Sequence, residues 1–177
     1  MAQRKGYCPL RTTNFNTQTC IRKIMNKAKI EMDIASLMGT WYVHYSNFPM
    51  WLKGNKREPT FTYSNYNSET RRFEDTVRYK TTTGNSKSIE GYDTVNNSSN
   101  TAFVWRGKGW LYIASSRWYI VEKADDLMVI RFDKTLFTPA GYDVICRRKV
   151  INPLDENNIV VWTKNQGISN MKKLMHT

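Results

Sequence analysis

The sequence contains few cysteines and histidines, which excludes several kinds of site. Of its 177 residues, three are cysteines, Cys8, Cys20 and Cys146, and two are histidines, His44 and His176. No cysteines stand at the C-x-x-C spacing of a structural zinc site. No Ser-His-Asp or Cys-His arrangement predicts nucleophilic catalysis either. We therefore expect no metal, no cofactor and no catalytic residues.

The cysteine count is odd, so at least one thiol is free or pairs with another chain. In an oxidising compartment, Cys8 could pair with Cys20, or either of them could pair with Cys146. The sequence does not choose among these pairings, and it does not fix the oligomeric state.

Long apolar runs are also absent. No stretch approaches the ~18 apolar residues of a membrane-spanning helix. The basic start MAQRKGYCPLRTTNFN is followed by no apolar run, so we recognise no signal peptide. Either the protein stays inside the cell, or a signal was removed before this numbering begins. The length of 177 residues, with no internal repeat, predicts one domain with its own core.

Acidic residues are scarce relative to basic ones, and the formal net charge is +12. Residues 1–32 hold seven Lys/Arg and one Glu, about half of the excess. We assign residues 1–32 to a basic N-terminal extension and residues 33–177 to the folded domain. The extension is either a plain solvated or packed segment, or an arm that contacts a membrane surface or another anionic partner. Nucleic acid is the partner we expect least.

Between Gly39 and Arg148, β-branched and aromatic residues alternate with polar ones. Such segments are 41–45, 61–63, 73–79 and 103–105. Turn-forming clusters of Gly, Asn, Asp and Pro recur between them every 10–15 residues. This spacing predicts an antiparallel meander that closes into a barrel or a sandwich.

Helical patterns flank the strands. Apolar residues at three- to four-residue spacing predict a helix within residues 20–32 and a helical turn at 33–38. After the strands, Asn152 can cap a helix that has Pro153 at its first position and ends at Gly167. Ile159, Val160 and Trp162 would supply its apolar face. Residues 168–174 then form a short strand or an extended tail.

Four places between residues 33 and 175 together resemble the lipocalin family. Gly39-Thr40-Trp41-Tyr42 is similar to the G-x-W motif that opens the first lipocalin strand. Trp118-Tyr119-Ile120-Val121 with Asp125-Asp126 resembles an aromatic strand and acidic turn of the family, although it departs from the usual T-D-Y form. Arg147, in YDVICR, stands where the eighth strand carries an arginine. The final helix and tail are similar to those of bacterial lipocalin and apolipoprotein D.

The resemblance implies an all-β fold, an eight-stranded antiparallel up-and-down β-barrel with a C-terminal α-helix and an N-terminal extension. It gives Gly39, Trp41 and Arg147 structural roles. Trp41 would plug the closed end of the barrel, and the Arg147 guanidinium would lie over its indole. The opening KGYCPLRTTNF resembles secreted apolipoprotein D-like chains, which favours secretion slightly over the cytoplasm, although the partner cysteine expected near residues 129–132 is absent.

Alternation decides which side chains would face the barrel interior. If Trp41 faces inward, Val43 and Tyr45 do so too, and His44 faces outward at the surface. Asp75 shares the inward face of its strand, and we expect it near the rim rather than buried. Each inward aromatic residue could contact a ligand or simply fill the core. The candidate ligand contacts are Val43, Tyr45, Trp51, Phe61, Tyr63, Val77, Tyr79, Phe103 and Trp105.

The segment 46–58 would join the first two strands across the open mouth. Its apolar residues, Phe48, Met50, Trp51 and Leu52, either pack down as a lid or gate the ligand. Nearby cations could attract an anionic head group such as a carboxylate. These cations are Lys53, Lys56 and Arg57, joined by Arg106 and Lys108 if they lie at the same mouth.

We therefore expect a non-enzymatic lipocalin that binds and transports or stores a small hydrophobic ligand. The ligand could be a fatty acid, lipid, retinoid or pigment-like molecule, and it could carry an acidic group. One alternative is an enzyme on the same barrel that acts on a lipophilic substrate. The other is an interaction module with a packed barrel that works through its basic arm.

Overall fold

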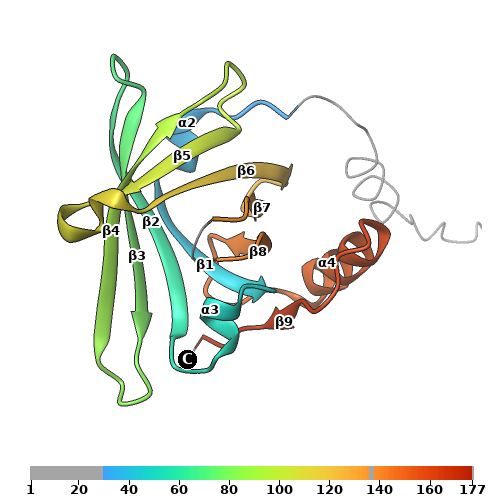
Figure 1. The fold of residues 1–177 in the computed structure, drawn as a ribbon. Helices are drawn as coiled ribbons and strands as arrows, with labels where there is room; N and C mark the ends of the chain where they lie inside the picture. Colours follow the sequence, from blue (N-terminus) through green and yellow to red (C-terminus); the bar gives the residue numbers. More distant parts are fainter. Residues whose placement is uncertain (1–29, 136–137, 177) are drawn as a thin grey trace, which may run out of the picture.

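The computed structural model describes residues 30–135 and 138–176. Within these residues, eight strands form a closed antiparallel barrel and a short ninth strand joins it (Figure 1). Sequence neighbours pair from β2 to β8, and β1 pairs with both β2 and β8, which closes the barrel. The predicted eight-stranded up-and-down barrel is confirmed. Its strands are β1 (Gly39–Ser46), β2 (Arg57–Asn67), β3 (Arg72–Lys80), β4 (Ser86–Val95), β5 (Ala102–Gly107), β6 (Ser115–Lys123), β7 (Leu127–Phe132) and β8 (Gly141–Cys146).

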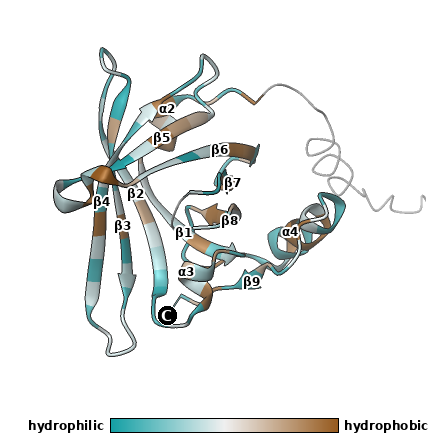
Figure 2. Ribbon diagram, in the orientation of Figure 1, coloured by the Kyte–Doolittle hydropathy of each residue, from teal (hydrophilic) through white to brown (hydrophobic). Residues whose placement is uncertain are grey.

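Alternate residues of each strand supply the barrel interior. On β3, the buried side chains of Phe73, Asp75 and Val77 alternate with more exposed neighbours. Hydrophobic and hydrophilic bands accordingly follow one another along β3 and β4 (Figure 2). Because side chains of a strand point to opposite faces in turn, this pattern buries one face of the sheet as the core.

Helix α4 (Pro153–Asn165) covers part of the outer face of the barrel. It begins as predicted, because the Asn152 side chain accepts a hydrogen bond from the Asp155 backbone N–H at 2.8 Å. Ile159 packs against Val129 and Val144 in a second, smaller core. Val160, in contrast, is exposed rather than on the apolar face. The tail that follows contains the short strand β9 (Lys172–Lys173), which pairs with β1.

A β-bulge in β1 changes which of its side chains face the interior. The pairing with β8 shifts so that Val43 lies opposite Ile145 but Tyr45 lies opposite Val144. Val43 and Ile145 belong to the interior core, whereas Tyr45 packs with Val144 in the outer core. The prediction that Tyr45 faces inward is therefore wrong, because the extra residue reverses the alternation.

His44 is buried, 3 % exposed, and not at the surface as predicted. Its Nε2 lies 2.8 Å from the carbonyl oxygen of Arg148, and its own carbonyl accepts the Leu174 N–H at 2.7 Å. The His176 ring lies 5.2 Å from the His44 ring. Burial lowers the pKa of His44 and favours the neutral imidazole. Its burial arises because the C-terminal tail returns onto β1.

Trp41 plugs the closed end of the barrel, as predicted. The side chain is 1 % exposed, and its Nε1 donates a hydrogen bond to the Leu37 carbonyl at 2.8 Å. Leu37 belongs to α2 (Ile34–Leu37), the predicted helical turn, whose N-cap is Asp33. The turn is therefore tied to the floor of the barrel.

Arg147 covers the Trp41 indole at the same end of the barrel. Its Cζ lies 3.8 Å from the centre of the Trp41 ring, which confirms the predicted cation–π contact. The guanidinium also donates hydrogen bonds to the carbonyls of Ser36, Met38 and Thr40. The backbone of Gly39 has a φ of +95°, which other residues rarely adopt, and a Cβ added there would lie only 3.0 Å from Arg147 Nη1. This position therefore requires glycine.

The predicted N-terminal extension, the helix within residues 20–32, Cys8 and Cys20 lie wholly or largely outside the described residues. Met32, at the end of the extension, is buried in the interior core and its N–H donates to the Ser99 carbonyl at 2.9 Å. Among the described residues, Cys146 is a free and fully buried thiol. No helix in this part of the chain is long and apolar enough to cross a membrane.

Replacement of Arg147 tests whether its contacts with Trp41 and the three carbonyls stabilise the closed end of the barrel. We expect Arg147→Ala to lower the free energy of unfolding by about 3 kcal/mol, because it removes the cation–π contact and leaves three carbonyls without their donor. Urea denaturation followed by tryptophan fluorescence measures this loss. The control is Arg106→Ala, since Arg106 is exposed and contacts Tyr112 in the same two ways, and we expect it to cost less than about 1 kcal/mol. Equal losses in the two variants would contradict this role.

Candidate ligand-binding cavity

A cavity of about 390 Å³ lies inside the barrel, lined by residues of every barrel strand except β1. The connections β1–β2, β5–β6 and β7–β8 also contribute, and they lie at the end opposite Trp41. Most of the wall is apolar or aromatic. The apolar lining residues include Phe48, Met50, Trp51, Phe61, Val77, Ile89, Trp105, Ile113, Trp118 and Phe132.

The β1–β2 connection packs down over the cavity as a lid. It contains α3 (Pro49–Leu52), in which Trp51 is 2 % exposed. The Phe48 ring stands edge-on to the Phe132 ring at 5.1 Å, and the Trp51 ring lies 6.4 Å from the Tyr79 ring. The predicted lid is thus present, and Phe48, Met50 and Trp51 also line the cavity.

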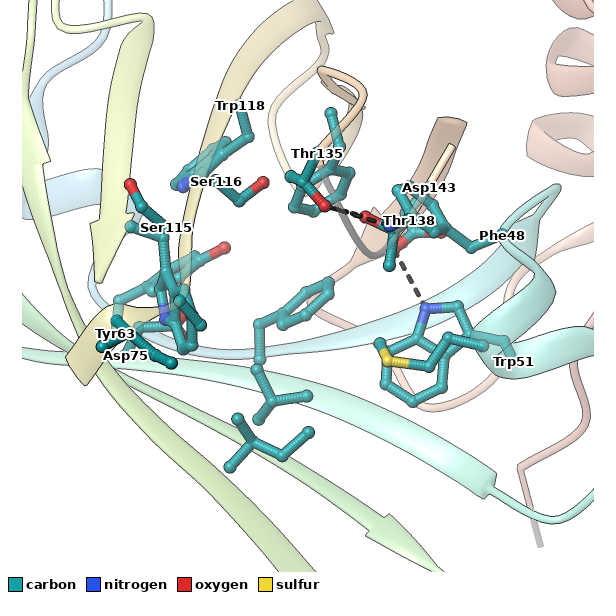
Figure 3. A pocket seen from close by; sticks show the side chains of 18 residues that line it. Phe48, Trp51, Tyr63, Asp75, Ser115, Ser116, Trp118, Thr135, Thr138 and Asp143 are labelled. Atoms are coloured by element: carbon teal, nitrogen blue, oxygen red, sulfur yellow. Dashed lines mark hydrogen bonds between the residues drawn. The ribbon is translucent and has the colours of Figure 1, made fainter. Parts of the chain in front are cut away.

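The structure brings five of the nine candidate ligand contacts together around this cavity. They come from the lid and from three strands, and Figure 3 shows Trp51 and Tyr63 on different sides of the space. The five are Trp51, Phe61, Tyr63, Val77 and Trp105.

The other four candidates lie elsewhere. Val43 is fully buried in the interior core, and Phe103 stacks on Trp118 at a ring distance of 4.1 Å. Tyr79 is partly buried beside Trp51, and Tyr45 lies outside the barrel near α4. Phe103 therefore supports a wall residue from behind, whereas Tyr45 has no access to the cavity.

Three carboxyl groups are buried within the barrel. Asp75, Asp93 and Asp143 are 6 %, 0 % and 1 % exposed, and Asp75 and Asp143 line the cavity. Trp118 Nε1 donates to Asp93 Oδ1 at 2.7 Å, and Trp51 Nε1 donates to Asp143 Oδ2 at 3.2 Å. Ser46 also hydrogen-bonds to Asp143, and Asp75 hydrogen-bonds to Asp93.

The prediction that Asp75 lies near the rim is wrong. Its register places it opposite Tyr63 of β2 and Gly91 of β4, well inside the barrel. Gly91 leaves room for the Trp105 indole, because a Cβ at position 91 would come within 2.3 Å of Trp105 Nε1. The tertiary pairing of strands therefore creates a polar site that the composition of β3 alone does not show.

Burial disfavours the charged form of all three carboxyls. Burial and then the charge of Asp93 hold the pKa of Asp75 well above its usual range. Burial also raises the pKa of Asp93, against hydrogen bonds from Trp118 and Asp75. Asp75 therefore keeps a proton that it shares with Asp93 near neutral pH. Burial raises the pKa of Asp143 to about 7, although hydrogen bonding by Ser46 and Trp51 opposes the shift.

Cations lie near the lid but not in the cavity wall. No Lys, Arg or His is among the described residues that line the cavity. Lys56 Nζ lies 6.0 Å from the centre of the Trp51 ring, and burial, then the charge of Lys53, lowers the pKa of Lys56. Lys108 instead pairs with Glu74 at 3.0 Å. Within the described residues, no cluster of His, Cys, Asp and Glu could hold a metal ion.

Sequence reasoning missed Asp93 and Asp143 and left the orientation of Trp118 open. The signal was present, because Asp93 alternates with Val95 and Asp143 with Ile145, both of which are buried. A charged residue at an inward position of an alternating strand indicates a polar group in the interior. Trp118 lines the cavity and Ile120 belongs to the interior core, so these two residues of β6 face inward.

Comparisons with known proteins support the fold. Neither a scan against models of protein families nor a search of curated proteins finds a match. H1 crustacyanin from the lobster Homarus americanus has a TM-score of 0.61 at 14% identity, over 91% of this chain and 86% of that one. The siderocalin Ex-FABP gives 0.61 at 13%, over 80% and 95%. The bovine lipocalin allergen Bos d 2 gives 0.59 at 8%, over 80% and 94%. The chain therefore has the lipocalin fold.

The buried Asp143 predicts a pH-dependent stability. Its folded pKa of about 7 exceeds the unfolded value of 3.8, so its contribution to stability is lost as pH rises from about 4 through 7. Asp143→Asn removes this cost, and we expect its melting temperature relative to wild type to rise by at least about 5 °C between pH 4.5 and pH 8. Thermal denaturation at both pH values measures the change.

The matched control is Asp125→Asn, which removes the same charge at an exposed position. Its melting temperature relative to wild type should stay constant between the two pH values. A constant difference for Asp143→Asn as well would show that Asp143 is not held neutral by burial.

Proposed function

We propose that this protein binds and carries a small hydrophobic molecule in the barrel cavity, without catalysing a reaction. The observation that supports this most strongly is the cavity of about 390 Å³ with an apolar and aromatic wall inside a closed barrel. Binding would be driven by removal of apolar ligand surface from water, at about 25 cal/mol per Å² before the costs of ordering. A preformed cavity keeps those costs low.

The fold is consistent with this proposal but does not determine it. The siderocalin Ex-FABP, which has the same fold, functions through dual ligand specificities. We further propose a relation to bacterial lipocalin and apolipoprotein D, because the capped helix α4 and the short strand β9 follow the barrel here. The domain division stays part of the proposal, with a basic extension before the barrel and Met32 packed into the barrel core.

The proposed ligand contacts are the five candidates that line the cavity, Trp51, Phe61, Tyr63, Val77 and Trp105. Val43 and Phe103 would act from behind, by keeping the wall and floor packed. Tyr79 would support the lid through Trp51. Tyr45 carries no ligand contact in this proposal, since it lies in the outer core.

An anionic group on the ligand and an anionic partner of the basic extension stay predictions. Lys56 beside Trp51 is the observation that favours a head group at the lid. The cavity below it contains carboxyls and no cation among its described lining residues. A carboxylate ligand would therefore have to keep its charged end at the mouth.

A cavity-filling substitution tests the proposal. Val77→Trp places a large ring in the cavity wall, and we expect it to weaken binding of the neutral fluorophore N-phenyl-1-naphthylamine at least tenfold. Isothermal titration calorimetry measures both affinities. The control is Arg78→Trp, one residue further along β3 on its exposed face, which should bind like the wild type. Unchanged binding by Val77→Trp would place the fluorophore outside the barrel and overturn the proposal.

A further inference from the structure

We propose that the cavity selects an organic amine, a small apolar molecule whose ammonium group pairs with Asp143. This inference rests on the proposed function and specifies the class of ligand. It follows from the position of one buried carboxyl, from the aromatic rings around it and from the charges that the interior lacks.

Asp143 places a buried carboxyl in the wall of the cavity. Its side chain projects from β8 and lines the cavity, with Ser46 of β1 and Ile130 of β7 as its strand neighbours. Trp51 Nε1 donates to Oδ2 at 3.2 Å and Ser46 also hydrogen-bonds to the carboxyl, but neither partner carries a charge. A buried carboxylate without a counter-ion costs free energy, and an ammonium group offers a positive charge and three donors.

Aromatic rings surround this carboxyl. Figure 3 shows Phe48, Trp51 and Asp143 on the same side of the cavity. Phe132 belongs to the same group, because its ring packs edge-on to Phe48 at 5.1 Å. Ring faces attract an ammonium group, most strongly where water is excluded. A cation beside Asp143 would therefore gain from both the carboxylate and the rings.

The described part of the chain supplies no cation of its own to the cavity wall. Lys56 lies over the rings of Trp51 and Tyr79, at 6.0 and 5.1 Å, and it is not among the lining residues. Arg147 is committed to Trp41 at the closed end. The counter-ion that Asp143 lacks is thus left for the ligand to provide. An acidic ligand would meet a like charge instead.

Asp75 gives the ligand a second polar contact on another wall. It lies away from Asp143 in the cavity (Figure 3), and it is 6 % exposed. Its neighbour Asp93 accepts from Trp118, and the two carboxyls share a proton. A hydroxyl or N–H group at the far end of the amine would fit Asp75. With about 390 Å³ of space, the body between these two groups must be compact.

Three probes that share one apolar body test the selection on the full chain. They are 2-(1-naphthyl)ethylamine, 2-(1-naphthyl)ethanol and 1-naphthylacetate, which are cationic, neutral and anionic at pH 7.5. We expect calorimetry to show the amine binding at least tenfold more tightly than the alcohol, and the acid binding most weakly. Alcohol or acid binding as tightly as the amine would overturn the proposal without any variant.

Variants then locate the ammonium group. In Asp143→Asn the ratio of amine to alcohol affinity should fall to about one, while the exposed control Asp125→Asn should keep the wild-type ratio. A full preference in Asp143→Asn, with loss in Asp75→Asn instead, would overturn the assignment to Asp143. Circular dichroism and melting curves verify that each variant is folded.

The fluorophore N-phenyl-1-naphthylamine separates the two proposals. If it binds in the cavity and the naphthyl amine shows no preference, the amine inference fails and the proposed function stands. If neither the fluorophore nor any naphthyl probe binds, the proposed function fails.

Discussion

The contact between Arg147 and Trp41 is the constraint on which the rest of the barrel depends. One guanidinium covers the indole and donates to three carbonyls of the segment that crosses the closed end. Trp41 in turn binds the Leu37 carbonyl of α2. One end is sealed in this way, and the connections at the other end line the cavity. The contacts that stabilise the barrel and the mouth of the cavity therefore lie at opposite ends of the same sheet.

Burial of the three interior carboxyls lowers the stability of the fold. Asp75, Asp93 and Asp143 are almost fully buried, and no Lys, Arg or His is among the described residues that line the cavity. Indole N–H groups of Trp51 and Trp118 only partly compensate. Such costs persist where the surrounding structure fixes them, and they are common at functional sites. The same groups that weaken the empty barrel would give it selectivity for a ligand.

Much of the fold could be predicted because it depends on local patterns. The turns, the period of two along β3, the cap at Asn152 and the G-x-W segment each act over a few residues. The same alternation placed four of the eight candidate ligand contacts on strands at the cavity, as Phe61 and Val77 show. The rest did not follow, because one bulge in β1 turns Tyr45 outward and the returning tail buries His44.

The sequence by itself determined that alternating strands form a barrel or a sandwich, because periodicity is a local property. Its resemblance to the lipocalin family predicted the closed barrel and the roles of Trp41 and Arg147. Only the tertiary structure decided what the cavity offers to a ligand. Asp75 and Asp143 lie far apart in the chain and on strands that are not neighbours, yet both reach the same space. The physical reason is that register and burial, which set the environment of each carboxyl, exist only once the barrel has closed.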